Sequence, residues 1–412
     1  MSIRKRGDKW LVTVELGRDE TGRRQRHCST HDSEKAAIAA ESIAKGEIAK
    51  GEWFDETDLL CGPFLDGWLE HKRPHVAPST HAMWSDFIRC HMKPAFGRLP
   101  LAKLSGLHIE HYEARLLSRG RRPLDRHELR RGETPITPAN AGLSATTVHK
   151  HRVMLRQALT YAVRHRLIRT NPTDGLDPIP EDDHEIRWLE LTEQDRLLTV
   201  ARAPRSVKNP DPHRLYVPTV TALGTGMRKG EILALRRSDV MFGTSKIAVR
   251  RGLQWQPGGT YGYRKGGKNG KGRVISAPEM LLELLAEQLR RQEAMKAIAV
   301  EAWANEDLVF SGPDGRPLNR DGFKSSWGRL VTKADLPGVR FHDLRHTHAT
   351  ELLRAGVHPK IVSERLGHSS VKITLDRYSH AIPDLQTEAA EKTDVLLRGL
   401  LGPRLSDEDV ER

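Results

Sequence analysis

The fold of this chain is decided by the stretch HDLRHT at residues 342–347, which places a histidine and an arginine three residues apart. On a helix, this spacing projects both side chains toward one side. Three more patterns stand around it: GMRKGEI at residues 226–232, LGHS at residues 366–369 and LDRYS at residues 375–379. Ahead of HDLRHT, residues 250–273 hold seven basic residues, eight glycines and no acidic residue. Together these patterns predict a cationic site that includes a tyrosine.

These residue types suit chemistry on a phosphodiester. The guanidinium groups of Arg228 and Arg345 can grip the non-bridging oxygens, because the planar fork of arginine matches their geometry. A lysine or histidine can move a proton to the leaving oxygen or from the attacking one. The hydroxyl of Tyr378 can attack phosphorus and form a covalent intermediate. No cluster of Asp and Glu indicates a metal, so cationic side chains would stabilise the transition-state charge directly.

Taken one at a time, these residues have simpler explanations. An arginine on a helix is more often a surface residue, and Tyr378 is one of six tyrosines that could be packed aromatics. The histidines at positions 342, 346 and 348 invite a zinc interpretation, but they lack the metalloprotease pattern and have no cysteine nearby. We therefore expect no metal, and the prediction depends on the ordered set.

The composition favours a basic protein of several domains. Its 412 residues correspond to roughly two or three domains. The formal net charge of +13 predicts an anionic partner, most commonly nucleic acid. No apolar run approaches the roughly 20 residues of a membrane helix, and residues 1–6 do not begin a secretory signal. Three cysteines without a CxxC pair favour a reducing cytoplasm over a disulfide framework.

The first 175 residues divide into a small α/β part and a helical part. Residues 9–16 and 23–30 predict a hairpin, and an Ala-rich helix should follow from Ser33 to about Lys50. Such a ββ(β)α module with a basic sheet can lie in a DNA groove, although a solvated charged hairpin would look the same. Residues 56–173 have helical periodicity. We expect an exposed basic loop over residues 115–131.

The remaining chain alternates predicted helices with two short strands. Residues 174–185, with two prolines and six acids, predict an inter-domain linker. The expected helices span about residues 215–223, 228–236, 278–299, 321–334, 343–355 and 360–366, and the expected strands span residues 246–249 and 273–275. The tail contains one amphipathic stretch, from Leu385 to Leu401, before an acidic end.

The ordered patterns resemble the tyrosine recombinase (phage integrase) family, in detail over residues 185–383 and more loosely over residues 1–180. The resemblance implies a multidomain fold, mainly α with small β-sheets. Its implied parts are an arm-type DNA-binding ββ(β)α module, an all-α core-binding (SAM-like) domain, an α+β catalytic integrase domain and a C-terminal tail, at residues 1–55, 56–175, 186–390 and 391–412. The stretch from Arg121 to Ala141 departs from the family as an insertion without a functional account.

The resemblance also implies a catalytic residue for each role. The set is Arg228, Lys268, His342, Arg345, His368 and Tyr378, with Glu231 at the family's acidic position. Lys268 is the best match for the family's lysine, but the Gly-rich hairpin is long enough that Lys265 or Lys271 could take its place.

The family mechanism divides the work among these residues. Arg228, Arg345 and His368 would hold the scissile phosphate, and Lys268 would protonate the leaving 5′-oxygen. His342 would act as acid or base near the attacking tyrosine. Tyr378 would form a 3′-phosphotyrosyl link that the 5′-hydroxyl of the partner strand reverses.

The resemblance implies double-stranded DNA attachment sites as substrate and a homotetramer on two duplexes. No cofactor is implied, since neither ATP nor a metal is needed. Accessory directionality or DNA-bending proteins are further implied partners. The N-terminal module favours an integrase of a prophage or integrative element over a chromosome-resolution recombinase. Two rival functions are a non-cleaving DNA-binding regulator and a type IB-like topoisomerase, which shares the chemistry. The amphipathic tail would contact a neighbouring subunit or pack on its own domain.

Overall fold

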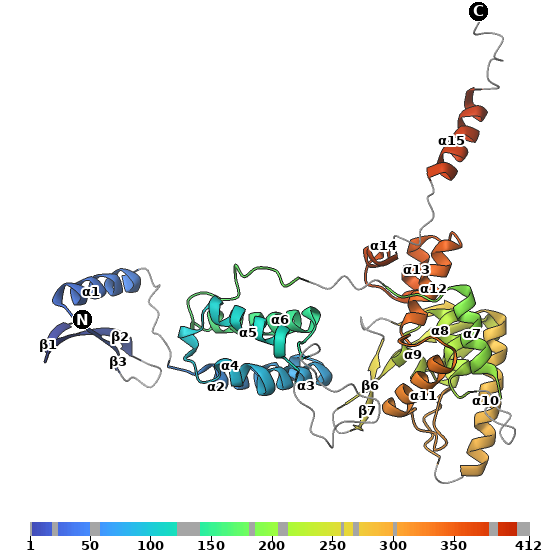
Figure 1. Cartoon of the computed structure of the whole chain (residues 1–412), viewed down its shortest axis with the longest axis horizontal. Helices are drawn as coiled ribbons and strands as arrows, with labels where there is room; N and C mark the ends of the chain where they lie inside the picture. The colour runs from blue at the N-terminus through green and yellow to red at the C-terminus, as the bar shows by residue number, and fades with distance from the viewer. Residues whose placement is uncertain are drawn as a thin grey trace, which may run out of the picture. The chain divides into compact units, whose positions relative to one another are not determined.

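The structure, a computed structural model, describes residues 2–18, 24–49, 58–121, 141–180, 186–204, 213–256, 259–266, 272–299, 303–378 and 386–401. These residues are mainly helical and include three small sheets (Figure 1). The chain divides into two compact units, residues 1–183 and residues 184–412. Over the described ranges, no helix is long and apolar enough to cross a membrane.

The N-terminal part is a three-stranded antiparallel sheet with one helix (Figure 1). Its strands are β1 (Ser2–Arg6), β2 (Lys9–Arg18) and β3 (Arg24–His31), and its helix is α1 (Glu34–Ala49). The predicted hairpin and helix are confirmed, and β1 adds the third strand by pairing with β2. Alternate residues Val12 and Val14 of β2 are buried with Ala37 and Ala44 of α1, which fixes the face of the sheet that the helix covers.

A helical domain follows, as the periodicity predicted. Its main helices are α2 (Cys61–Lys72), α3 (Pro78–Phe87), α5 (Gly106–Arg119) and α6 (Ala145–Arg164), with a π-helical turn at Ile88–Met92 and the short helix α4 (Lys93–Phe96) after α3. Trp68 and Trp84 stack in its core with ring centroids 5.2 Å apart. Among the described residues this core has 24 buried apolar side chains, so the domain has its own hydrophobic centre.

Two expectations for this region need correction. The basic loop does not begin at residue 115, because Tyr112 and Leu116 are buried and hold α5 helical as far as Arg119. The first part of the predicted linker also packs against the helical domain instead of being free. Ile179 is buried in the helical core, and Arg152 donates a hydrogen bond to the carbonyl oxygen of Asp177. Residues 122–140 and 181–185 lie outside the described residues, and with them most of the insertion and the end of the linker.

The second unit contains helices around one large core. They are α7 (Leu191–Arg202), α8 (Tyr216–Thr225), α9 (Lys229–Leu233), α10 (Glu279–Ala299), α11 (Arg320–Lys333), α12 (Asp343–Arg354), α13 (Pro359–Leu366) and α14 (Val371–Tyr378) (Figure 1). The predicted helices of this region are confirmed, although α9 ends three residues earlier than expected. Helix α14 was not predicted, and it carries Tyr378 at its last position.

In the described part of this unit, five strands make two separate sheets. The first joins β4 (Val240–Met241), β5 (Lys246–Val249) and β8 (Arg273–Ser276) in antiparallel order. The second is a ribbon of β6 (Arg251–Trp255) and β7 (Tyr261–Lys265), which lies between β5 and β8 in sequence. The predicted strands correspond to β5 and β8. The basic, Gly-rich segment between them was expected to form a hairpin, and it contains this antiparallel ribbon.

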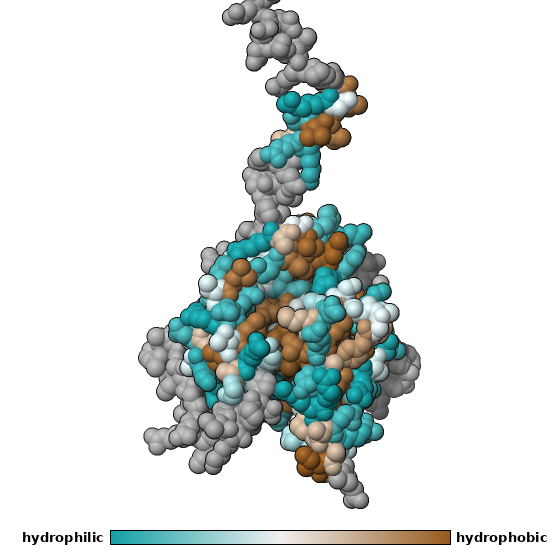
Figure 2. All heavy atoms as spheres, turned by 90° about the vertical axis from the view of Figure 1, so that its right-hand side faces the viewer, coloured by the Kyte–Doolittle hydropathy of each residue, from teal (hydrophilic) through white to brown (hydrophobic). Residues whose placement is uncertain are grey.

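The tail contains α15 (Gln386–Leu401), in agreement with the predicted amphipathic stretch. Its apolar residues Val395, Leu396, Leu397 and Leu400 are exposed to solvent. Figure 2 shows these apolar side chains beside the polar ones of the same helix.

Candidate active site

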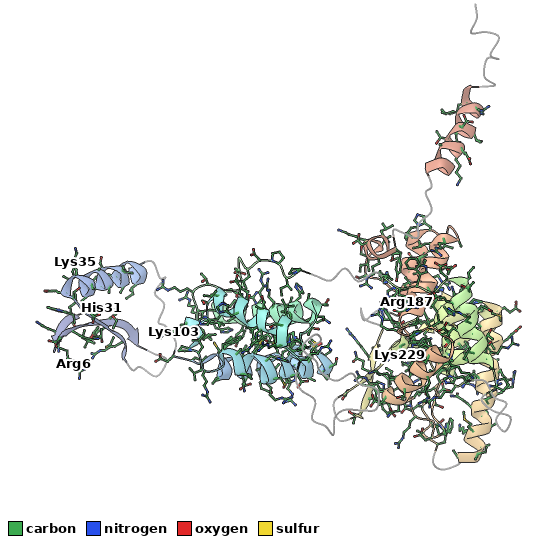
Figure 3. The ribbon with its side chains drawn as sticks, viewed as in Figure 1. Arg6, His31, Lys35, Lys103, Arg187 and Lys229 are labelled. Carbon is green, nitrogen blue, oxygen red and sulfur yellow. The ribbon has the colours of Figure 1, made fainter. Side chains whose placement is uncertain are left out.

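Arg228 is positioned by a tight turn between two helices. Helix α8 ends at Thr225, and Gly226 follows with a φ of +64°, which a residue with a side chain rarely adopts. A Cβ atom at position 226 would also lie 2.6 Å from the ring of His348, so the turn requires glycine. Arg228 then caps the N-terminus of α9, where the sequence placed it. The next residue, Lys229 (labelled in Figure 3), has its Nζ 5.5 Å from the ring centroid of Phe323.

The side chain of Arg228 is held by a buried carboxylate. Glu231 is only 3% exposed, and its Oε1 lies 3.1 Å from Nη1 of Arg228. Arg273, at the start of β8, forms a second ion pair with both oxygens of Glu231, at 3.0 and 2.8 Å. Burial would raise the pKa of Glu231, but Arg273 and Arg228 together hold it below its usual value. Glu231 therefore stays charged and fixes two arginines.

We expect Glu231→Gln to destabilise the protein by about 3 kcal/mol, because removal of one partner leaves buried positive charge without compensation. Glutamine keeps the shape and one accepting oxygen, so the loss reports the charge. Thermal or denaturant unfolding of the full chain measures the effect. A control, Glu287→Gln, removes a half-exposed carboxylate that also pairs with two arginines, and it should cost much less than Glu231→Gln. Equal losses for the two variants would contradict this account of Glu231.

Arg345 lies in the first turn of α12 and is only 2% exposed. Its Nη1 donates a 2.7 Å hydrogen bond to the carbonyl oxygen of Gly226, in the turn before Arg228. Its Nη2 is buried and has no hydrogen-bond partner among the residues that the structure describes. Burial and the charge of Arg228 lower the pKa of Arg345, yet a guanidinium remains charged at neutral pH. A buried, charged N–H without an acceptor is able to bind a ligand oxygen.

Two histidines lie within the electrostatic field of Arg228 and Arg345. His342 is the residue before α12, and His368 follows Gly367, which ends α13 with a φ of +68°. Burial, followed by the charges of Arg345 and Arg228, lowers the pKa of His342 to about 4 and that of His368 to about 3. Both rings are therefore neutral at neutral pH.

Tyr378 ends α14 with a side chain that has no exposed surface. Its hydroxyl lies 2.7 Å from Nδ1 of His346, one helical turn after His342. Burial raises the pKa of Tyr378, and the charges of Arg345, Arg377 and Arg228 act in the opposite direction. The phenol is therefore protonated and lies within the field of both phosphate-binding candidates.

The structure thus brings together five of the six predicted catalytic residues, as hydrogen bonds and shared electrostatic effects show for Arg228, His342, Arg345, His368 and Tyr378. The lysine differs. Lys268 and Lys271 lie outside the described residues, and Lys265 is exposed at the end of β7, opposite Arg251.

Sequence reasoning missed two residues of this site. Arg273 was predicted only as the start of a strand, yet it pairs with Glu231 and donates through Nε to the carbonyl oxygen of Arg365. His346 was considered only as a zinc ligand, yet it bonds to Tyr378. The spacing of four residues from His342 was the one signal that could have pointed to His346.

Comparisons with known proteins agree with this arrangement. Residues 187–384 match the phage integrase family, and residues 62–117 match the N-terminal SAM-like domain of phage integrases. A XerC-like tyrosine recombinase of Caldanaerobacter subterraneus subsp. tengcongensis is 26% identical over 403 residues, which cover 93% of this chain and 95% of that protein. The ICEBs1 integrase of Bacillus subtilis is 24% identical over 400 residues, which cover 96% and 100%.

A solved structure shares the fold. The Tn1549 transposon integrase in complex with a circular intermediate DNA has a TM-score of 0.66 and 22% identity, and the match covers 81% of this chain and 99% of that one. The multidomain fold, mainly helical with small sheets, is therefore that of an integrase. The chain belongs to the phage integrase family, the tyrosine recombinases, which are enzymes that cut and rejoin DNA.

Proposed function

We propose that this recombinase is the integrase of a prophage or another integrative element, and that it works through a 3′-phosphotyrosyl intermediate. The observation that carries the proposal is the buried guanidinium of Arg345, whose Nη2 has no acceptor in the described part of the chain. The same guanidinium acts electrostatically on Tyr378 and on both histidines of the site. One phosphodiester oxygen at Nη2 would satisfy this group and bring phosphorus near the nucleophile.

In this mechanism the cations hold the phosphate and Tyr378 attacks it. Arg228 and Arg345, assisted by His368, stabilise the negative charge that grows on the phosphate oxygens in the transition state. Glu231 holds Arg228 in place for this role. Lys268 donates a proton to the leaving 5′-oxygen, and His342 assists as acid or base. The 5′-hydroxyl of a partner strand then attacks the phosphotyrosine and reseals the backbone.

Tyr378 must become accessible before it can react. Its side chain has no exposed surface, so the phosphorus of a DNA backbone cannot reach the hydroxyl in this arrangement. Tyr378 is also the last residue of α14. DNA binding therefore has to uncover the Tyr378 hydroxyl.

The relatives support the biological side of the proposal. One is named an integrase of ICEBs1, and another was solved in complex with a circular intermediate DNA of a transposon. By analogy, the substrate here is double-stranded DNA at attachment sites, and the working assembly is a homotetramer on two duplexes in the cytoplasm. Accessory directionality or DNA-bending proteins belong to this proposal. The exposed apolar residues of α15 are the candidate contact between subunits.

The proposal divides the chain by task. Residues 1–55 would bind arm-type DNA sites, residues 56–175 would hold the core site, residues 186–390 would cut, and residues 391–412 would form the tail. The N-terminal sheet supports the first assignment, because Arg4, Lys5 and Arg6 of β1 are exposed. Such cations bind phosphates by releasing counterions.

Recombination between two separate DNA molecules tests the proposed function. The DNA flanking the gene supplies the candidate sites, and purified full-length protein should join one flank to a host-type site on a second duplex. Relaxation of one supercoiled plasmid without exchange would instead identify a topoisomerase. Binding without any cleavage would identify a regulator, and exchange that needs only one pair of identical core sites would favour the chromosome-resolution class.

We expect removal of residues 1–55 to weaken integration between element and host sites strongly, while cleavage of an isolated core site stays largely intact. The reason is that the helical domain and the second unit each have their own hydrophobic core. A matched variant in which Arg4, Lys5 and Arg6 are all replaced by Gln should behave like the truncation without removing the fold. Equal losses of integration and core cleavage would show that the module only supports folding.

A further inference from the structure

The hydroxyl of Tyr378 has a neighbour to which the family pattern gives no role. Its oxygen lies 2.7 Å from Nδ1 of His346, on the second turn of α12. His346 is 6% exposed, so the bond is shielded from water. His342, the histidine expected near the nucleophile, packs edge-on against the ring of His346 at 5.0 Å between ring centroids.

The direction of this hydrogen bond follows from the hydrogens available. A phenol carries one hydrogen, and a neutral imidazole has one donating and one accepting nitrogen. If Nδ1 carried the imidazole hydrogen, the phenolic hydrogen would have no acceptor elsewhere in the described part of this buried site. Leaving a buried donor without an acceptor costs about 1–3 kcal/mol. Tyr378 therefore donates, Nδ1 of His346 accepts, and the imidazole hydrogen is on Nε2.

The charge state of His346 agrees with an accepting role. Burial, followed by the neighbouring His342, lowers the pKa of His346 to about 4, so its ring is neutral at neutral pH. The titratable and charged groups that face the Tyr378–His346 pair are His342, Asp343 and Arg345 of the α12 region, Arg377 of α14 and Arg228 before α9. Three of them are arginines, whose positive charges favour loss of a proton from Tyr378.

We propose that His346 is a catalytic residue that accepts the phenolic proton when Tyr378 attacks the phosphodiester, an inference that rests on the proposed function. In the first step the Tyr378 Oη–P bond forms, the bond from phosphorus to the 5′-oxygen breaks, and the phenolic proton moves to Nδ1. The leaving 5′-oxygen takes its proton from the general acid. In the second step the incoming 5′-hydroxyl gives up its proton to the same acid, and Nδ1 returns its proton to the departing phenolate.

The proposal assigns His346 and Lys268 to opposite sides of the phosphorus, and this makes them separable. A DNA strand with sulfur in place of the bridging 5′-oxygen has a leaving group that needs no proton. Cleavage of such a strand therefore depends on activation of Tyr378 and is independent of the general acid. The probe is a nicked suicide duplex from the DNA that flanks the gene, made with oxygen or sulfur at the cleavage position.

The test compares two variants of full-length protein in single-turnover formation of the covalent adduct. His346→Asn keeps an accepting oxygen near the position of Nδ1 but cannot take a proton, and His346→Phe removes both functions. We expect both to slow cleavage by about 10²–10⁴-fold on the oxygen and the sulfur duplex alike. Between pH 7 and pH 9, the rate of the variants on the sulfur duplex should rise about tenfold per pH unit, because hydroxide replaces the base.

The outcomes separate a proton acceptor from a packing residue. The control His358→Asn changes an exposed helix cap to another good cap and should keep the wild-type rate. Wild-type rates for His346→Asn would overturn the inference, since a mere hydrogen-bond acceptor would then suffice. A slow His346→Asn whose rate on the sulfur duplex does not depend on pH would also overturn it. If His346→Phe unfolds, His346→Asn decides.

Failure of the proposed function gives a different result. If wild-type protein forms no adduct with either duplex, or if Tyr378→Phe still forms one, the phosphotyrosyl mechanism itself is wrong. If wild-type protein forms an adduct that Tyr378→Phe lacks, the mechanism stands. The His346 variants then test only the assignment of the proton acceptor.

Discussion

Tyr378→Phe protein forms no covalent adduct with a nicked suicide duplex, and it recombines no DNA: this is the largest effect that we expect. Phenylalanine keeps the ring that packs in a buried cluster with Ala349, Leu353 and Leu366, but it removes the one atom that can attack phosphorus. The measurement is retention of labelled DNA on denatured protein. Wild-type protein should stay covalently attached to the nicked strand. The short fragment that carries the released 5′-hydroxyl diffuses away, so the strand cannot be resealed.

The controls separate loss of the nucleophile from loss of the fold. Removal of the hydroxyl leaves Nδ1 of His346 without its donor in a buried site, which costs about 1–3 kcal/mol. The assay temperature therefore has to lie well below the unfolding midpoint of Tyr378→Phe. Tyr216→Phe, which changes a half-buried tyrosine of α8, should keep normal adduct formation. DNA binding by Tyr378→Phe should remain close to wild type. An adduct that survives in Tyr378→Phe would assign the nucleophile to another residue.

The parts of the site that depend on local sequence could be predicted. The helices expected at about residues 215–223 and 228–236 left a short turn between them, and the structure has Arg228 just after this turn, as the cap of α9. The spacing of His342 and Arg345 required one helical face, and the start of α12 provides it. Local spacing determines local geometry on a helix, so these predictions needed no knowledge of distant contacts.

The parts that depend on contacts between distant segments could not be predicted. Arg273 and Glu231 are 42 residues apart, and Tyr378 and His346 are 32 residues apart. The hydrophobic periodicity of a sequence does not indicate which strand end contacts which helix start. Helix α14 was missed because its eight residues are too few to show a clear helical period, and it lacks a start signal such as the proline that begins α13. A hairpin was expected in the segment that holds β6 and β7, but its paired residues could not be predicted, because glycines there indicate loops rather than strands.

The general acid is the residue for which position and chemistry can be separated by experiment. The connection from β7 to β8 runs from Lys265 to Arg273, and Arg273 is tied to Glu231 beside Arg228. Lys268 and Lys271 stand five and two residues before Arg273 in the sequence. Distance along the chain therefore does not choose between them, and the family pattern favours Lys268.

We expect Lys268→Ala to slow cleavage of an ordinary duplex by about 10²–10⁴-fold, the usual contribution of general acid–base catalysis. The same variant should cleave a duplex with sulfur at the bridging 5′ position at close to the wild-type rate, because that leaving group needs no proton. Lys265→Ala and Lys271→Ala serve as matched controls with the same loss of charge, and they should stay within a few-fold of wild type on both duplexes. Rescue by sulfur in one of them instead would transfer the role to that lysine. If sulfur does not relieve the defect of Lys268→Ala, the lysine binds the phosphate. A sulfur leaving group removes the need for a proton donor, but the phosphate oxygens still need a positive charge beside them.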